Sequence, residues 1–507
     1  MRCRLYAVTL KTVVFRVDLH RAAPGRVAMT GSRDGRRRLL GALLGSGLVL
    51  AACSDTGTSA VPPVGPPATV TSELNPAPLP VGWLLSESRE RCQIADGLLL
   101  HRIRRGSASQ EPAPLPCTDV VQENQFGGGS LGSVFATGPY AFHVLEIDPD
   151  RFTGQLEPAL AQGRIAGKAT TSEMADAAGA IAAINAGFFV VGPGGTSSRD
   201  PDQGDDGLAG DPAGVTVLQG ELVSEAVGSR EALVFSAAGR DVRFPRTETR
   251  LWLEAGGESW ALDGINRVPG AIRNCGGTGG DSPTESARHD VTCSDPAELI
   301  WFSTDWGLDT PAVDGLELVL DAQGRVMHTR PAGGSLPAGG SVIAATGDRV
   351  VELQRAASAV GPVLMRAEVY MDGEPVTLVP ELSILNGGPG LVRDGEALLT
   401  DNEGGFRHPG DPIFGLTWVD GPNPRTMIGR TASGRLLLVV CDGRQPDWSV
   451  GLPLRDAVRV MRHLGAVDAM ALDGGGSSTL VVNGQVVNSP SDGAERPVSD
   501  ALLLIAR

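Results

Sequence analysis

The chain has 507 residues, of which 41% are hydrophobic and 20% charged, a composition typical of a folded protein with an apolar core. Its net charge is −16, but residues 1–53 hold ten basic and two acidic residues, so the remainder has a net charge of −24. An acidic body of this kind repels nucleic acid and anionic membrane surfaces, which argues against nucleic acid as a partner and leaves the membrane as one only through an N-terminal lipid.

The N-terminal region has the pattern of an export signal. The basic segment 32–38 precedes a short apolar run at 39–52 and then Cys53. These features are typical of a secretory signal peptide, and the run is too short to span a bilayer comfortably. The sequence LVLAAC also resembles a bacterial lipobox, which predicts lipidation of Cys53 and a membrane-anchored lipoprotein on the periplasmic or cell-surface side. An ordinary signal peptide with a chance cysteine is the alternative, and Met29 is an alternative start.

The segment that follows is predicted to be a tether. Residues 54–80 are rich in Pro, Ser and Thr and cannot form a core. An exported chain meets an oxidising compartment, and four later cysteines fall into two local pairs in loop-like sequence. We therefore expect two disulfides, Cys92 with Cys117 and Cys275 with Cys293.

The first half of the folded region reads as strands with one helix. Apolar and β-branched residues predict strands within 96–106 and 140–148. The segment 171–189 predicts a short helix followed by a buried strand that ends at Asn185. A hairpin is expected at 207–224.

The pattern changes from residue 226 to about 380, where short strands alternate with Gly/Pro turns. We interpret 226–380 as an inserted β-rich subdomain. Residues 381–507 resume alternating strands and include a helix at 452–465, whose apolar residues recur at helical spacing. The expected fold is α+β: a mixed β-sheet domain with packed helices, formed by 81–225 and 381–507.

Three apolar runs end in polar residues. The first ends at Asn185, the second at Asp442 with Arg444 two residues on, and the third at Asp473. Many α/β and α+β proteins form their sites just beyond buried strand ends, because a rigid strand orients the side chain.

Two predicted hairpins bring further polar residues to such ends. Folding of the segment 425–444 sets Arg425 opposite Asp442, and the Asn483-Gly484 turn sets residues 478–479 near 488–489. We expect the polar ends of these hairpins to meet at a common edge.

The residue types gathered there suit a phosphorylated sugar. Arginines bind phosphate bidentately, a Gly/Ser loop offers backbone N–H groups to an anion, and carboxylates serve glycoside or phosphoester cleavage. The loop lacks the Gly-Lys-Ser/Thr ending of a nucleotide-binding P-loop, which argues against NTP hydrolysis, and no spacing resembles a metal site. The alternative is structural: Asp473 caps a turn, and Arg444 pairs with Asp442. The candidate catalytic residues are Asp473, Asp442 and Glu495. The candidate binding residues are Asn185, Arg425, Arg444, Gly474, Gly475, Gly476, Ser477, Ser478, Thr479 and Arg496.

Several of these residues lie in stretches that resemble the phosphodiester glycosidase family. The motifs, in chain order, are NAGFF (185–189), PRTMIG (424–429), VVCDGRQ (439–445), LDGGGSSTLVVNG (472–484) and NSPSDGAERPVSDALLL (488–504). The resemblance extends over roughly 95–225 and 380–507. It implies an α+β domain that hydrolyses a sugar from a sugar-1-phosphodiester with no obligatory cofactor, and it marks the ten positions Asn185, Arg425, Asp442, Arg444, Asp473, Ser477, Ser478, Thr479, Glu495 and Arg496. Cys441 departs from the family pattern, and we interpret it as a small buried thiol.

A sugar-1-phosphate diester already has a fairly good leaving group, so arginines can stabilise the departing phosphate. We assign Asp473 to support the oxocarbenium-like centre or to activate water, with Asp442 or Glu495 as second choice, and Arg425 and Arg444 to hold the phosphate. The alternatives are a phosphodiesterase that cleaves the P–O bond, a glycosidase acting on non-phosphorylated envelope glycans, and a non-catalytic lipoprotein that binds polysaccharide.

Overall fold

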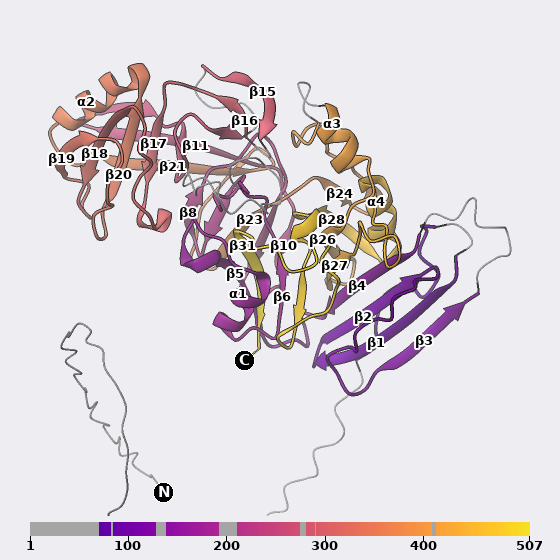
Figure 1. Cartoon of the computed structure of the whole chain (residues 1–507). Helices are drawn as coiled ribbons and strands as arrows, with labels where there is room; N and C mark the ends of the chain where they lie inside the picture. The colour runs from indigo at the N-terminus through magenta and orange to yellow at the C-terminus, as the bar shows by residue number, and fades with distance from the viewer. Residues whose placement is uncertain are drawn as a thin grey trace, which may run out of the picture. The chain divides into compact units, whose positions relative to one another are not determined.

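A nine-stranded sheet forms the frame of the computed structural model (Figure 1). Every strand pair described in it is antiparallel, so the expected mixed sheet is wrong for this part. The structure describes residues 70–82, 85–127, 138–191, 210–273, 280–288, 291–407 and 412–506. From edge to edge, the strands are β25 (Glu396–Ala397), β24 (Gly390–Arg393), β28 (Ala466–Ala471), β26 (Arg425–Thr431), β27 (Leu436–Cys441), β4 (Tyr140–Ile147), β2 (Leu98–Arg105), β1 (Glu87–Ala95) and β3 (Val121–Phe126).

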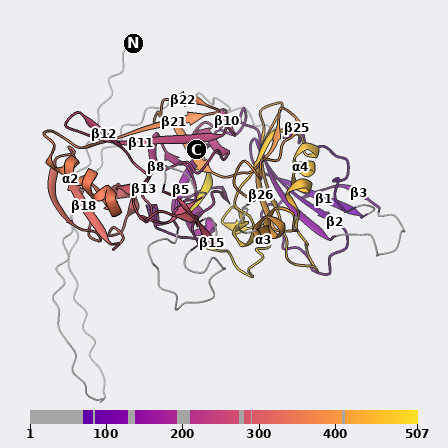
Figure 2. The ribbon, with the colours of Figure 1, turned by 90° about the horizontal axis from the view of Figure 1, so that it is seen from above.

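Strand β27 shows why this sheet is apolar on both faces. Leu437 and Val439 belong to the core that contains helix α4 (Leu454–His463), whereas Leu438 and Val440 belong to the core on the opposite face. Figures 1 and 2 both place α4 on one side of β26 and β5 on the other. A strand covered on both faces needs a continuous apolar run, which is what LLLVVC supplies.

A second sheet packs against the face away from α4. Leu480 and Leu502 of this sheet share a core with Leu438 of β27. Its strands, in order, are β30 (Gln485–Val486), β29 (Leu480–Val482), β6 (Ala182–Asn185), β31 (Asp500–Ile505) and β5 (Gln155–Leu160). Asn185 and Asp500 therefore lie at the ends of neighbouring strands of one sheet.

The remaining strands form four smaller sheets. The expected hairpin at 207–224 is present as β7 and β8, and β13 and β17 make a parallel pair. One sheet contains β10 (Val242–Arg243), β9 (Ala232–Ser236), β23 (Leu382–Asn386), β7 (Thr216–Leu218) and β8 (Glu221–Ser224). The next sheet contains β12 (Glu258–Ala261), β11 (Thr247–Ala255), β21 (Leu364–Met371) and β22 (Glu374–Val376). Another contains β13 (Gly264–Ile265), β17 (Leu299–Phe302), β20 (Ser341–Thr346), β18 (Gly315–Leu320) and β19 (Val326–Pro331). The last contains β14 (Ile272–Arg273), β16 (Val291–Ser294) and β15 (Ser282–Arg288).

Helices are few in the described residues, so strands dominate a fold that remains compatible with the α+β class. The helix expected in 171–189 is α1, which begins after a capping box between Thr170 and Glu173. The α-helices are α1 (Thr171–Ala178), α2 (Val350–Ser358), α3 (Pro412–Phe414) and α4, and α3 continues as the π-helix η4 (Gly415–Val419). The 3-10 turns are η1 (Ala161–Gly163), η2 (Thr304–Trp306), η3 (Gly347–Arg349) and η5 (Gly475–Ser477).

The cysteines largely follow expectation. Cys92 and Cys117 form a disulfide. Cys293 is disulfide-bonded, and its expected partner Cys275 lies outside the described residues. Cys441 is a buried free thiol whose pKa is raised by burial, which makes it a poor nucleophile.

The expected signal peptide, Cys53 and residues 54–69 lie outside the described residues. Residues 70–80, which we assigned to the tether, pack on the fold instead: Val70 and Leu79 are buried, and Arg89 donates to the carbonyl of Asn75. The Pro-rich composition predicts a tether, but the apolar residues within it can be buried against the fold. All described residues belong to the unit Gly65–Arg507.

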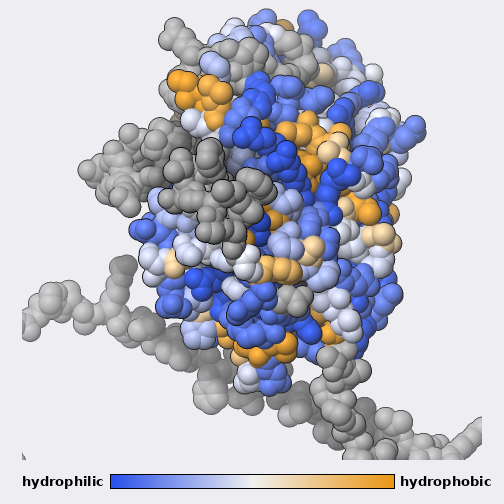
Figure 3. Space-filling model, turned by 90° about the vertical axis from the view of Figure 1, so that its right-hand side faces the viewer, coloured by the Kyte–Doolittle hydropathy of each residue, from blue (hydrophilic) through white to orange (hydrophobic). Residues whose placement is uncertain are grey.

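Hydrophilic side chains predominate on the face drawn in Figure 3, and apolar ones gather there in small separate patches. None of the described helices has the length and apolarity needed to cross a membrane.

Candidate active site

The glycine loop that follows β28 (474–476) is closely surrounded, and two of its glycines face guanidinium groups. A Cβ atom on Gly475 would lie 3.0 Å from Nη2 of Arg444, and one on Gly476 would lie 2.2 Å both from Nη2 of Arg496 and from Oδ2 of Asp492. Gly475 also has a φ of +61°, which glycine adopts without strain. The structure thus brings Arg444 and Arg496 to the loop, as the sequence predicts.

Arg425 lies beside the first glycine of the same loop. Its Cδ atom is 3.9 Å from the position of a Cβ on Gly474. The side chain is buried, with Nε donating to the carbonyl of Leu452 at 2.7 Å and Nη2 donating to the carbonyl of Trp418. The ring of Trp418 also lies 5.0 Å from the guanidinium carbon.

The guanidinium of Arg425 has unused binding capacity. Its Nη1 atom is buried and has no hydrogen-bond partner among the described residues. Burial, with a further contribution from the neighbouring Arg444, lowers the pKa of Arg425 to about 9. A buried cation held mainly by backbone carbonyls is poorly compensated, so an anion at this position is favourable.

The guanidinium of Arg444 is held in place by Asn423. Asn423 accepts from its Nε at 3.0 Å and from its Nη2 at 2.8 Å. Burial and then the neighbouring Arg496 lower the pKa of Arg444, whereas the carboxylates of Asp492 and Asp473 act in the opposite direction. Arg444 has a φ of +59°, which is unusual for a residue with a Cβ.

Asp473 is fixed by backbone contacts at the end of β28. Its N–H donates to the carbonyl of Ala186 at 2.9 Å, and its own carbonyl accepts from Nδ2 of Asn185 at 2.7 Å. Oδ1 of Asn185 accepts from the hydroxyl of Thr426 at 2.9 Å and from the N–H of Thr479 at 3.0 Å. Asn185 therefore positions the loop rather than facing a ligand.

The hydroxyl groups of the loop divide into two kinds. Oγ of Ser478 accepts from Thr426 at 3.1 Å, which makes it structural. Oγ of Ser477 and Oγ1 of Thr479 are buried and have no hydrogen-bond partner among the described residues. These two hydroxyls are available to a bound group.

The carboxylate of Asp442 is occupied, which does not fit the expected catalytic role. Its Oδ2 lies 3.2 Å from Nε2 of His143 and accepts from Nε1 of Trp448 at 2.7 Å. Its Oδ1 accepts from Nδ2 of Asn488 and from the N–H of Ser489, both at 3.0 Å. Asp442 thus anchors the end of the second hairpin.

The expected pairing of Arg425 with Asp442 is wrong by one residue. Arg425 pairs with Cys441 across β26 and β27. The turn contains three residues, 432–434, with Gly434 at a φ of +88°, where a two-residue turn was expected. The Asn483-Gly484 turn does have two residues, both at positive φ, as predicted.

The carboxylate of Glu495 is also engaged by the protein. Its carboxylate accepts from the N–H of Ser172 at 3.0 Å and from the hydroxyl of that residue, so it binds the first turn of α1. Beside it, Arg496 is paired with Asp492 at 2.7 Å.

Sequence reasoning missed two residues near Asp473. Asp500 is fully buried, and burial, with the charge of Asp473 as a lesser cause, raises its pKa to about 6. Asn386, at the end of β23, accepts from the N–H of Phe188 at 2.8 Å. Asp500 lies within the quoted 488–504 motif, and a carboxylate that begins an apolar run was the available signal.

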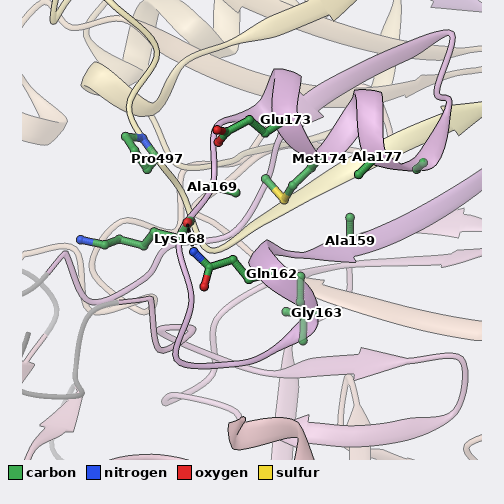
Figure 4. A pocket seen from close by; sticks show the side chains of 11 residues that line it. Ala159, Gln162, Gly163, Lys168, Ala169, Glu173, Met174, Ala177 and Pro497 are labelled. Carbon is green, nitrogen blue, oxygen red and sulfur yellow. Dashed lines mark hydrogen bonds between the residues drawn. The ribbon is translucent and has the colours of Figure 1, made fainter. Parts of the chain in front are cut away.

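A cavity of about 760 Å³ lies beside α1 and shares no lining residue with the glycine loop. Figure 4 shows Met174 and Ala177 of α1 on one side of it and Ala159 of β5 on another. Its polar side chains are engaged, since Lys168 donates to the carbonyl of Val191 and Glu173 caps α1. We assign it no role.

Comparisons with known proteins agree with the motifs. Residues 315–505 match the family model for phosphodiester glycosidase. The chain is 39% identical over 90 residues to the SPbeta prophage-derived uncharacterized protein YomE of Bacillus subtilis (strain 168), which covers 17% of the chain and 14% of that protein. It is 30% identical over 114 residues to the N-acetylglucosamine-1-phosphodiester alpha-N-acetylglucosaminidase of Mus musculus, which covers 22% of each. The chain therefore aligns with less than a quarter of either relative.

A putative exported protein from Burkholderia pseudomallei K96243 resembles the whole fold, with a TM-score of 0.71, 26% identity, and coverage of 86% of this chain and 100% of that one. A hypothetical protein from Synechocystis shares the fold alone, with a TM-score of 0.55 and 18% identity over 82% of this chain and 75% of that one. By the motifs within it and by the match to the family model, the part of the chain at residues 315–505 is similar to the phosphodiester glycosidase family.

Proposed function

We propose that the chain is an exported hydrolase that releases a sugar from a sugar-1-phosphodiester. One observation carries the proposal: Arg425, Arg444 and Arg496 all border the glycine loop that begins directly after Asp473. Three guanidiniums around a loop without side chains favour a phosphate, and the adjacent carboxylate supplies the acid–base or nucleophilic group that hydrolysis needs.

In this proposal, the chemistry is divided between hydrogen-bond donors for the phosphate and the carboxylate of Asp473. Nη1 of Arg425 and the hydroxyls of Ser477 and Thr479 have free donors that can stabilise negative charge on the leaving phosphate. Asp473 supports the oxocarbenium-like carbon or activates water for attack on it. Asp442 and Glu495 act as structural residues in this proposal, because protein donors already use their carboxylates.

For the sugar, we propose an α-linked N-acetylglucosamine as the first to test. The mouse relative is named for that activity, and its aligned segment supports the choice. Export is supported by the N-terminal pattern, by the description of the Burkholderia neighbour as an exported protein, and by the Cys92–Cys117 disulfide. Lipidation at Cys53 and the status of 226–380 as an inserted subdomain are part of the same proposal.

The test is a screen of α-linked sugar-1-phosphodiesters with the full chain, in which free sugar and phosphomonoester are measured as products. Hydrolysis that is lost in Asp473→Asn supports the proposal. Release of a sugar phosphate with the alcohol supports P–O cleavage by a phosphodiesterase. A folded protein that hydrolyses none of the diesters but binds polysaccharide supports the non-catalytic alternative.

A further inference from the structure

Two buried polar side chains lean over the glycine of the NAGFF motif. A Cβ atom on Gly187 would lie 2.4 Å from Nδ2 of Asn386 and 2.8 Å from Oδ2 of Asp500. Asn386 is 3% exposed and Asp500 is 0% exposed. We call this arrangement the Gly187 cradle: an amide donor from β23 and a carboxyl group from β31, above a residue with no side chain.

The amide of Asn386 has a fixed orientation. Its Oδ1 accepts from the N–H of Phe188 at 2.8 Å, so the NH₂ group must be the one that faces Gly187. That Nδ2 atom is buried and has no hydrogen-bond partner among the described residues. Buried donors are nearly always satisfied in folded proteins, so an unsatisfied one points to a bound group.

The carboxyl group of Asp500 complements this donor. Its Oδ1 accepts from the N–H of Gly187 at 2.6 Å, and its Oδ2 accepts from the hydroxyl of Ser499 at 3.0 Å. A carboxylate oxygen can accept more than one hydrogen bond, so Oδ2 retains capacity. A donor of Asn386 and an acceptor of Asp500 therefore both lie against Gly187.

The cradle adjoins the proposed catalytic carboxylate. Gly187 follows Ala186, whose carbonyl accepts from the N–H of Asp473 at 2.9 Å. The charge of Asp473 also contributes to the raised pKa of Asp500, which places the two carboxyl groups near each other.

We propose that Asn386 and Asp500 bind one ring hydroxyl of the substrate's sugar and thereby set sugar specificity. A hydroxyl is suited to this pair because it accepts from Nδ2 of Asn386 and donates to Oδ2 of Asp500 at the same time. The inference rests on the proposed function for the identity of the ligand as a sugar. A site built to hydrogen-bond a hydroxyl discriminates strongly against the analogue that lacks it.

The test is direct sugar binding by the full chain, independent of turnover. Methyl α-N-acetylglucosaminide and its monodeoxy analogues are titrated by calorimetry or ligand-observed NMR. We expect one deoxy analogue to bind the wild type about tenfold more weakly than the parent sugar, the effect of one lost hydrogen bond. Asn386→Asp, which keeps the acceptor for Phe188 but removes the donor, should weaken the parent sugar about tenfold and abolish the difference between parent and that analogue.

Ser383→Ala, on the same strand but outside the cradle, is the matched control and should leave the ranking unchanged. If Asn386→Asp does not fold, Asp500→Asn completes the same cycle. An unchanged ranking of analogues in a folded variant overturns the inference, as does a wild type that binds every analogue equally, which would mean that water alone fills the cradle. Sugar binding that depends on Asn386, without any hydrolysis of diesters, would support the inference and contradict the proposed hydrolase function. Hydrolysis and sugar binding that are unaffected by Asn386→Asp would support the hydrolase function and contradict the inference.

Discussion

Nη2 of Arg444 lies 3.0 Å from the point where Gly475 would carry a Cβ atom. The glycine therefore serves two purposes, because its φ of +61° forms the turn and its missing side chain leaves room for a cation. These two purposes can be separated by experiment.

Gly475→Ala should weaken anion binding as well as stability. The added methyl group would press on the guanidinium of Arg444 and shift it, so we expect kcat/KM on the phosphodiester to fall about tenfold, and the left-handed backbone to cost about 1 kcal/mol of unfolding free energy. Gly484→Ala is the matched control, since its φ is +69° and the nearest atom to its Cβ position is 3.7 Å away. It should lose similar stability with unchanged kcat/KM. Equal loss of activity in both variants would contradict the account.

Arg425 should make the protein responsive to phosphate. A ligand that binds only the folded state raises its stability, and this cation is buried with Nη1 unused. Inorganic phosphate at 100 times its Kd should stabilise the wild type by about 2.7 kcal/mol, seen as a rise in Tm. Arg425→Lys should lose most of this rise, because lysine cannot reproduce the planar fork. Arg430→Lys, at a surface pair with Asp468, should keep it.

We expect Asp442→Asn to lower mainly the stability of the protein and Asp473→Asn to lower mainly its activity. Asp442→Asn places an NH₂ group against donors that now meet a carboxylate oxygen, so we expect a loss of about 1–3 kcal/mol in unfolding free energy. Asp473→Asn should lower kcat by about 10²- to 10⁴-fold, the range for a positioned acid–base group, with a smaller change in stability. Denaturant unfolding and turnover measured on both variants check this division. An Asp442→Asn protein that is fully stable but inactive would restore Asp442 as the catalytic carboxylate.

Because of Asp500, the free energy of unfolding should decrease as the pH rises from about 4 to about 6. Its folded pKa of about 6 exceeds the usual unfolded value of about 3.9, so its contribution is present at low pH and is lost as the pH rises through 6. The shift corresponds to about 3 kcal/mol. Asp500→Asn cannot ionise, so the difference in unfolding free energy between wild type and variant should change across this interval. A pH-independent difference would show that Asp500 is not the titrating group.

Local signals in the sequence predicted much of this arrangement. The Asn483-Gly484 turn, the helix at 452–465 and the strand that ends at Asn185 depend on neighbouring residues, and each is present. The register of Arg425 was missed because a three-residue turn and a two-residue turn look alike in sequence.

Asn386 and Asp500 could not be predicted as a pair. They come from different sheets and meet only through tertiary packing over Gly187, which no periodicity in the sequence records. Likewise, Asp442 and Glu495 are acids within the quoted motifs, but two of the residues that engage their carboxylates, His143 and Ser172, lie far away in the chain.

The central claim is that the arginine-lined glycine loop and Asp473 act together on one sugar-1-phosphodiester. Hydrolysis of the methyl diester of α-N-acetylglucosamine-1-phosphate in ¹⁸O-labelled water tests it most directly, with mass spectrometry of the methyl phosphate released. We predict turnover that leaves the methyl phosphate unlabelled, because water attacks the sugar carbon, and that disappears in Asp473→Asn. Labelled phosphate, or no turnover by a folded wild-type protein that nevertheless binds the diester, would contradict the account.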